Sequence, residues 1–304
     1  MKEITLYWSN ICILHKFELN ALENATALLR KKGISLVIKH FGIGYPTRMA
    51  EYLLQDDALL PDIIVSTDLE VFENDTIFSK FKDNLYPLQQ HFKLKQAFQN
   101  HAVNRLETLL PFLVIPLIFS SDQDIKKNLS IEEVVQKKTP TCFGGMANSG
   151  SKSVLKAIWS HYGIEALQGF LDVSTITNMP IQSFQAIRTH MHSLALVPSI
   201  YAETGTGQGL TFAYPTNGAI ALPSYITARK SVPLDDVKTV LETLLTADFC
   251  NYFVDAGKLV CCLDIAKETT LSAEQDYQFL YPSNDWFLQT PQTALKKIYQ
   301  TYLS

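Results

Sequence analysis

Residues 142–153 form the densest cluster of small and polar residues in the chain, with the sequence CFGGMANSGSKS. The amphipathic run that follows, residues 154–162, predicts a helix. A helix N-terminus presents unpaired N–H groups and a partial positive charge, and small residues let a ligand approach that backbone. The cluster is therefore either an anion-binding helix start or a glycine-rich turn that ends in an ordinary serine N-cap.

A nucleotide-binding P-loop is excluded by the spacing inside this cluster. Gly145 and Gly150 are separated as in the P-loop pattern, but Ser151 stands between Gly150 and Lys152. The lysine comes one position late, and on a helix this rotates it by roughly 100°. No convincing apolar strand precedes the cluster, so we expect no nucleotide hydrolysis.

Composition excludes several other classes of protein. The chain has 304 residues, of which 47% are hydrophobic, so a full core is available. Its net charge of −4 and its lack of basic runs argue against a nucleic-acid partner. The longest apolar run, residues 109–119, is too short to span a membrane and contains two prolines.

The first residues, 1–8, alternate like a strand and lack the features of a signal peptide. The sequence as written therefore predicts a cytoplasmic protein. A chain from which a leader had been removed would look the same and would be extracytoplasmic.

The cysteines do not indicate a disulfide framework or a zinc site. Their number is odd, their spacing is wide and no CxxC pair occurs. We expect most of them to be small buried residues. They are Cys12, Cys142, Cys250, Cys261 and Cys262.

The N-terminal third predicts a βαβαβ unit with a parallel sheet. The expected strands are residues 3–8, 34–40 and 61–65, and the expected helices are residues 17–32 and 47–55. Ligands bind beyond the carboxyl ends of the strands in such sheets. Three loops should converge there, and their small and polar residues are binding candidates: Ser9, Asn10, Gly44, Tyr45, Ser66, Thr67 and Asp68.

The remaining segments predict further alternation of strands and helices. The prolines of the strand at 109–119 suggest a sheet edge or a bend. Ser130 precedes a helix that runs to Lys137, with Glu133 at the third position after it. The other expected elements are helices 165–171, 180–192, 234–246 and 247–256, strands 194–198, 210–215 and 225–230, a flexible turn at 205–209 and a final helix.

Five sequence features follow one another along the chain: PDIIVSTD at 61–68, LYPL at 85–88, NSGS at 148–151 with AIWSHYG at 157–163, YPTNGAI at 214–220, and ADF at 247–249 with AG at 256–257. In this order they resemble the type II periplasmic-binding-protein fold of ABC-transporter solute receptors. The similarity is greatest to the branch for ferric iron, 2-aminoethylphosphonate, thiamine and polyamines.

The resemblance implies two α/β lobes, each a mixed, mostly parallel sheet flanked by helices, joined by two crossing strands. The first lobe would comprise residues 1–112 and 212–304, and the second residues 113–211. A ligand would lie between them, and the lobes would close on it in a hinge motion. The protein would be a monomeric, non-enzymatic receptor that serves an ABC permease. In accord with that, no paired acid/base motif stands out in the sequence.

The resemblance also bears on the ligand. Ferric members use paired tyrosines, a histidine and a carboxylate, whereas this chain has only Tyr201 at the matching place and Ser9-Asn10 at the first strand end. His190 and His192 are two residues apart on an expected helix and so lie on different faces. We therefore expect no metal or cofactor.

We expect instead a phosphate-like, phosphonate-like or carboxylate anion. Two alternatives stay open: a leaderless cytoplasmic sensor or carrier of the same fold, and a ferric-ion binder with a synergistic anion. The candidate residues, besides the seven named above, are Asn148, Ser149, Gly150, Ser151, Tyr201 and Asn217.

Overall fold

The structure is a computed structural model that describes residues 1–11, 14–42, 44–125, 129–145, 149–268 and 278–303. The chain divides into two compact units. Unit 1 contains Met1–Val114, Pro223–Gly257 and Cys261–Glu268, and unit 2 contains Ile115–Leu222, Lys258–Val260 and Thr269–Ser304. The C-terminal helices therefore belong to unit 2, whereas the resemblance implied a first lobe that contains all of residues 212–304.

Two long strands run through both units, β4 (Leu110–Ser121) and β9 (Ala219–Ala228). The expected strand at 225–230 begins earlier, at Ala219. β4 is not an edge strand, because it pairs with β7, β8 and β10. Its ladders with β7 and β8 begin at Leu117 and Phe119, beyond Pro111 and Pro116, so neither ladder needs an N–H from the two prolines of β4.

Unit 1 is built on the strand order β2-β1-β3-β9. β1 pairs in parallel with both β2 and β3, which confirms the predicted parallel βαβαβ unit, and β3 pairs antiparallel with β9. Its elements are β1 (Lys2–Ser9), α1 (His15–Lys31), β2 (Ile34–Phe41), α2 (Met49–Leu54), β3 (Ile63–Ser66), α3 (Glu70–Glu73), α4 (Asp75–Phe78), α5 (Gln96–Gln99), α11 (Leu234–Leu244) and α12 (Ala247–Asp255).

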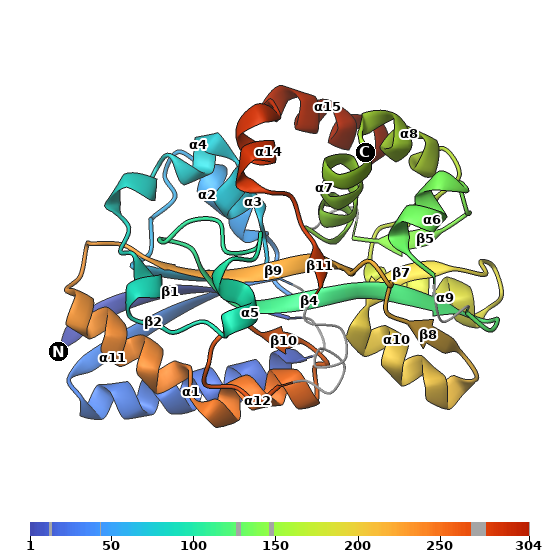
Figure 1. Cartoon of the computed structure of the whole chain (residues 1–304). Coiled ribbons are helices and arrows are strands. Elements are labelled where there is room, and N and C mark those ends of the chain that lie inside the picture. The colour runs from blue at the N-terminus through green and yellow to red at the C-terminus, as the bar shows by residue number, and fades with distance from the viewer. Residues whose placement is uncertain (12–13, 43, 126–128, 146–148, 269–277, 304) are drawn as a thin grey trace. The chain divides into compact units, whose positions relative to one another are not determined.

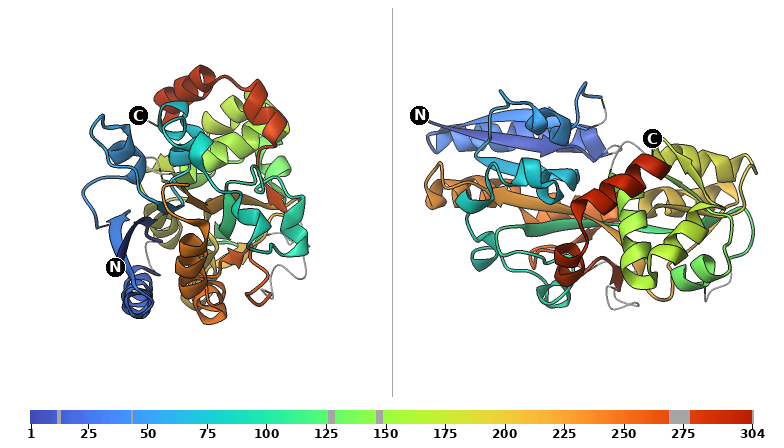
Figure 2. Two further views of the ribbon diagram at one scale, coloured as in Figure 1. Left: turned by 90° about the vertical axis from the view of Figure 1, so that its left-hand side faces the viewer. Right: turned by 90° about the horizontal axis from the view of Figure 1, so that it is seen from above.

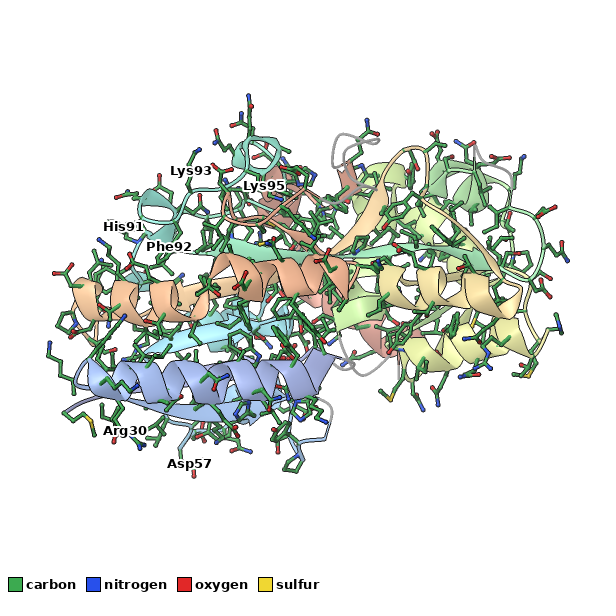
Figure 3. All side chains as sticks on the ribbon, turned by 90° about the horizontal axis from the view of Figure 1, so that it is seen from below. Arg30, Asp57, His91, Phe92, Lys93 and Lys95 are labelled. Atoms are coloured by element: carbon green, nitrogen blue, oxygen red, sulfur yellow. The ribbon has the colours of Figure 1, made fainter. Side chains whose placement is uncertain are left out.

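Helices cover both faces of this sheet, with α1, α11 and α12 on one face and α2, α3 and α4 on the other (Figure 1). α1 forms because Leu22, Ala25 and Leu29 recur at helical spacing and are all buried. It ends where Gly33 takes a φ of +81°, a left-handed conformation that favours glycine. Figure 3 looks onto this face and shows Arg30 near that end of α1.

Ion pairs hold segment 261–268 against the rest of unit 1. Lys93 and Lys95 lie close together on the chain (Figure 3) and pair with Asp264 and Glu268. Lys95 is buried and also donates from Nζ to the Lys267 carbonyl over 2.8 Å. β10 (Val260–Cys261) begins this segment and pairs with β4.

Unit 2 is built on the strand order β4-β7-β5-β6, in which β5 is parallel to β6 and β7. Its elements are α6 (Ile131–Gln136), β5 (Cys142–Gly144), α7 (Ser149–Tyr162), α8 (Ile164–Leu171), β6 (Thr175–Thr177), α9 (Pro180–Arg188), β7 (Ala195–Pro198), α10 (Ser199–Gly205), β8 (Thr211–Ala213), β11 (Phe279–Leu280), α14 (Asn284–Gln289) and α15 (Gln292–Tyr302).

The two faces of the unit 2 sheet have separate cores. Phe143 and Phe170 belong to the core under α6, α7 and α8, and Phe184 belongs to the core under α9 and α10. The C-terminal helices α14 and α15 run beside α7 and α8 (Figure 2), and Trp286 packs edge-on against Trp159 with the ring centroids 5.6 Å apart.

Two local predictions in unit 2 are wrong. A short strand, β5, precedes α7, although the sequence suggested none. A strand of three residues is too short to show alternation of apolar and polar residues. The expected flexible turn at 205–209 is instead the end of α10, a 3₁₀ turn at Thr206–Gln208 and Gly209, whose φ of +80° ends that turn.

Candidate functional site

The three predicted loops of unit 1 meet at one edge of its sheet. Ser9 is opposite Phe41 in the register of β1 and β2, and Trp8 is opposite Val65 in that of β1 and β3. The Asn10 backbone N–H donates to the Phe41 carbonyl over 2.9 Å, which fixes Asn10 beside the end of β2. Ser9 and Ser66 end their strands as buried residues, so the parallel sheet brings these candidates together.

Asn10 is the candidate with the most distinctive surroundings. Only 6% of its surface is exposed, yet neither Nδ2 nor Oδ1 has a hydrogen-bond partner among the described residues. Gly42, with a φ of +109°, packs so close that an added Cβ would lie 3.2 Å from the Asn10 carbonyl oxygen. A buried amide without partners is costly to the fold and is a feature of ligand sites.

Two histidines that were not among the predicted site residues, His15 and His40, lie next to the loop after β2. The ring of Tyr45 stacks on His40 with centroids 5.7 Å apart and meets His15 edge-on at 5.8 Å. Burial, and then the charge of His15, lowers the pKa of His40, against a smaller raising effect of Glu23. Gly44, the other predicted residue of this loop, is exposed with a φ of +91°.

The loop after β3 is held by an ion pair rather than left open to a ligand. Arg48 Nη2 lies 2.6 Å from one carboxylate oxygen of Asp68, and the Ala50 backbone N–H donates to the other over 3.1 Å. The Ser66 hydroxyl accepts from the Asp68 N–H over 2.9 Å. Asp68 thus has an evident structural role, and Thr67 is half-buried between these two residues.

In unit 2, the parallel strands β5, β6 and β7 are followed by α7, α9 and α10. Three helix N-termini therefore start from the same edge of the sheet, where their dipoles favour negative charge. Gly144 lets the end of β5 pack closely against Met179, the residue just before α9. A Cβ at Gly144 would lie 2.6 Å from the carbonyl carbon and oxygen of Met179.

The start of α7 is closely packed and polar. Ser149, Gly150, Ser151 and Ser153 are all buried, and Asn148 lies outside the described residues. The hydroxyls of Ser151 and Ser153 have no hydrogen-bond partner among the residues described. Farther along the helix, the Lys152 Nζ lies 5.2 Å from the Tyr299 ring, and the Nζ of the fully buried Lys156 lies 5.7 Å from the Phe287 ring.

The remaining two candidates in unit 2 differ in their surroundings. Tyr201, on α10, is half-buried and stacks on Phe184 with centroids 5.9 Å apart. The amide of Asn217 is already engaged: its oxygen accepts from the Ile131 N–H over 3.0 Å and its nitrogen donates to the Tyr162 hydroxyl over 2.6 Å. Asn217 thus ties the start of α6 to α7.

Neither a metal cluster nor a membrane span is found in the described part of the chain. Within it, no group of three or more His, Cys, Asp or Glu residues is arranged to hold a metal ion. The described helices include none with the length and apolarity needed to cross a membrane.

Comparisons with known proteins identify the fold of the chain. No family model matches the chain, and no curated protein matches it. Among solved structures, apo ferric ion-binding protein A of Pasteurella haemolytica aligns with a TM-score of 0.67 and 13% identity, covering 100% of this chain and 96% of that chain. The chain has the type II periplasmic-binding-protein fold.

Two further structures with this fold carry different descriptions. The substrate-binding protein of an ABC transporter from Agrobacterium tumefaciens has a TM-score of 0.64 and 11% identity, covering 99% of this chain and 94% of that chain. A two-component system protein described as mediating signal transduction has a TM-score of 0.63 and 15% identity, covering 98% and 100%. The type II fold consists of two α/β lobes with two crossing strands, and the crossing strands here are β4 and β9.

Proposed function

We propose that this protein is a non-enzymatic solute-binding protein for ABC-type transport and that the start of α7 binds an anionic group of the solute. The group is phosphate-like, phosphonate-like or a carboxylate. The single observation that carries the proposal is the buried hydroxyl of Ser151, in the first turn of a 14-residue helix, which has no hydrogen-bond partner among the described residues.

The energetics of the Ser151 hydroxyl support a bound acceptor. A buried hydroxyl without a partner costs about 1–3 kcal/mol, and the early N–H groups of a helix also need acceptors. An oxyanion offers several acceptor oxygens at once and is favoured by the helix dipole.

Positive charge within unit 2 supports the same ligand class. Lys152 and Lys156 follow on the same helix, and the Nζ atoms of both lie over aromatic rings of the C-terminal helices. The Lys152 ammonium group therefore places a positive charge next to Ser151 in the sequence.

A sensing role is the second candidate function, and the two-component neighbour with 15% identity favours it. Four cysteines, Cys142, Cys250, Cys261 and Cys262, are buried and free, which also suits a reducing compartment. A receptor for transport and a sensor share the ligand-binding step, so the same binding experiment tests that step for both.

The test is a thermal-shift and calorimetric screen with inorganic phosphate, 2-aminoethylphosphonate, sulfate, citrate and ferric ion. We expect an oxyanion to stabilise the wild type, Ser151→Ala to weaken its binding about tenfold, and Ser151→Asp to abolish it by like-charge repulsion. Ser130→Asp is the matched control, because Ser130 caps α6 in the same unit and aspartate is an equally good N-cap. Unchanged binding in Ser151→Asp would overturn the proposal.

A further inference from the structure

Unit 1 contains a compact group of buried polar atoms that the anion site does not use. Asn10 is nine-tenths buried, and His15 and His40 are half-buried with their Nδ1 atoms shielded. Within the described part of the chain, four atoms of these side chains have no hydrogen-bond partner: Asn10 Nδ2, Asn10 Oδ1, His15 Nδ1 and His40 Nδ1.

The fold itself gathers these three side chains. His40 lies opposite Trp8 in the parallel ladder, and Asn10 follows Trp8 by two residues, which is the spacing that returns a side chain to the same face of a strand. α1 begins at His15 after the same loop, and Tyr45 contacts both imidazole rings. Three segments of the chain thus meet around one small volume.

The nearby charged groups are paired, balanced by an opposite charge, or directed elsewhere. Arg48 pairs with Asp68 and Glu70, and Lys39 points to the opposite face, where its Nζ lies 3.2 Å from the centre of the Tyr52 ring. Glu18 accepts from Ile11 N and Trp8 Nε1, and burial raises its pKa to about 8, so it is largely neutral at pH 7. Glu23 and Arg30 line a pocket together with His40 and carry opposite charges, so neither sign of charge dominates there. These surroundings therefore favour an uncharged group.

The unpartnered atoms call for a group that both donates and accepts. The Asn10 amide offers one donor group and one acceptor, and an imidazole Nδ1 is a donor or an acceptor depending on where the ring carries its proton. Adjacent hydroxyls match this set, because every hydroxyl supplies a donor and acceptor lone pairs. A free carboxylate only accepts and would leave Asn10 Oδ1 unpaired.

We infer that Asn10, His15 and His40 form a hydroxyl-binding subsite in unit 1, which selects solutes that carry a polyol or sugar portion. This inference rests on the proposed solute-binding function and narrows its substrate class. Neither histidine was among the candidates from the sequence, because only the parallel register of β1 and β2 brings His40 beside Asn10.

The first test needs no knowledge of the solute. If the Asn10 amide awaits a ligand, Asn10→Leu removes two unpaired buried atoms and should raise the melting temperature of the ligand-free protein by about 2–4 °C. Asn217→Leu is the matched control: its amide has two partners, so the same substitution should lower the melting temperature. A fall in the Asn10→Leu melting temperature like that of the control would overturn the inference.

The second test observes the imidazole nitrogens by NMR during titration with glycerol, glucose, glycerol 3-phosphate and inorganic phosphate, with His15→Gln and His40→Gln for assignment. We expect at least one hydroxylated probe to shift the His15 and His40 nitrogens in the wild type and not in Asn10→Leu. If no hydroxylated probe shifts them, the inference is wrong. That failure is separate from failure of the anion site, which Ser151→Asp reports through phosphate binding.

Discussion

The indole Nε1 of Trp8 donates a hydrogen bond to the buried carboxyl group of Glu18 over 3.1 Å. The other oxygen of Glu18 accepts from the Ile11 backbone N–H over 2.9 Å. The pair joins the first turn of α1 to the end of β1 and so supports the loop that carries Asn10. Burial raises the pKa of Glu18 to about 8, although both hydrogen bonds lower it.

This pKa has a consequence for stability against pH. A carboxyl whose folded pKa lies above its ordinary value of 4.5 stabilises the fold when protonated. That contribution is fully present below pH 4.5 and is lost as the pH rises through about 8. We expect the free energy of unfolding to fall over this range by an amount on the order of a few kcal/mol.

Glu18→Gln should remove this dependence, because a neutral amide keeps an acceptor for the Trp8 indole. Urea denaturation at a series of pH values measures the slope. Glu23→Gln, at an exposed position on the same helix, is the control and should retain the wild-type slope. Equal slopes in Glu18→Gln and the wild type would contradict the role of Glu18.

Arg48→Met should destabilise unit 1, because it leaves the buried carboxylate of Asp68 without its cation. We expect a loss of about 2–3 kcal/mol, less than for a fully buried pair, since the Arg48 side chain is 24% exposed. Lys2→Met, which breaks the exposed pair with Asp236, should cost less than about 0.5 kcal/mol. Similar losses in the two variants, measured by urea denaturation, would show that Arg48 has no special role.

Gly144→Ala should disturb the junction between β5 and α9. The new Cβ would lie 2.6 Å from the Met179 backbone, which side-chain movement does not relieve, so we expect a loss of about 1–3 kcal/mol. Gly207→Ala meets nothing within 4 Å and should leave the melting temperature nearly unchanged. If both variants have the melting temperature of the wild type, the close approach of Gly144 to Met179 is not present in solution.

Asn217→Ala separates a structural role from the ligand role expected from the sequence. Losing the hydrogen bond from the Ile131 N–H at the start of α6 and the bond to Tyr162 should cost about 1–2 kcal/mol of stability. We expect phosphate affinity to stay within about twofold of the wild type, since removing an already paired amide takes no contact from the anion. A tenfold loss of affinity without a loss of stability would instead place Asn217 at the ligand.

The sequence predicted the elements whose periodicity is long enough to read. β1, α1, β2 and β3 each show a clear apolar pattern, and the parallel order followed from their alternation. β5 was missed because three residues carry no pattern. His15 and His40 were missed because they are 25 positions apart in the chain and meet only through the sheet register.

The polar residues near the two sheet edges divide in a way that sequence alone does not reveal. Asp68 and Asn217 looked like ligand residues, but their polar atoms hold the fold together. Asn10 and Ser151 looked the same in the sequence, yet their polar side-chain atoms are buried without partners among the described residues. Burial and hydrogen-bond partners, which depend on distant segments, make the difference.

Native mass spectrometry of the purified protein tests the central claim most directly. After incubation with inorganic phosphate and 2-aminoethylphosphonate, we expect the wild type and Ser130→Asp to carry one bound oxyanion, or a co-purified anionic solute, that Ser151→Asp lacks. The same bound mass in Ser151→Asp, or no bound anion in the wild type, would contradict an anion site at the start of α7.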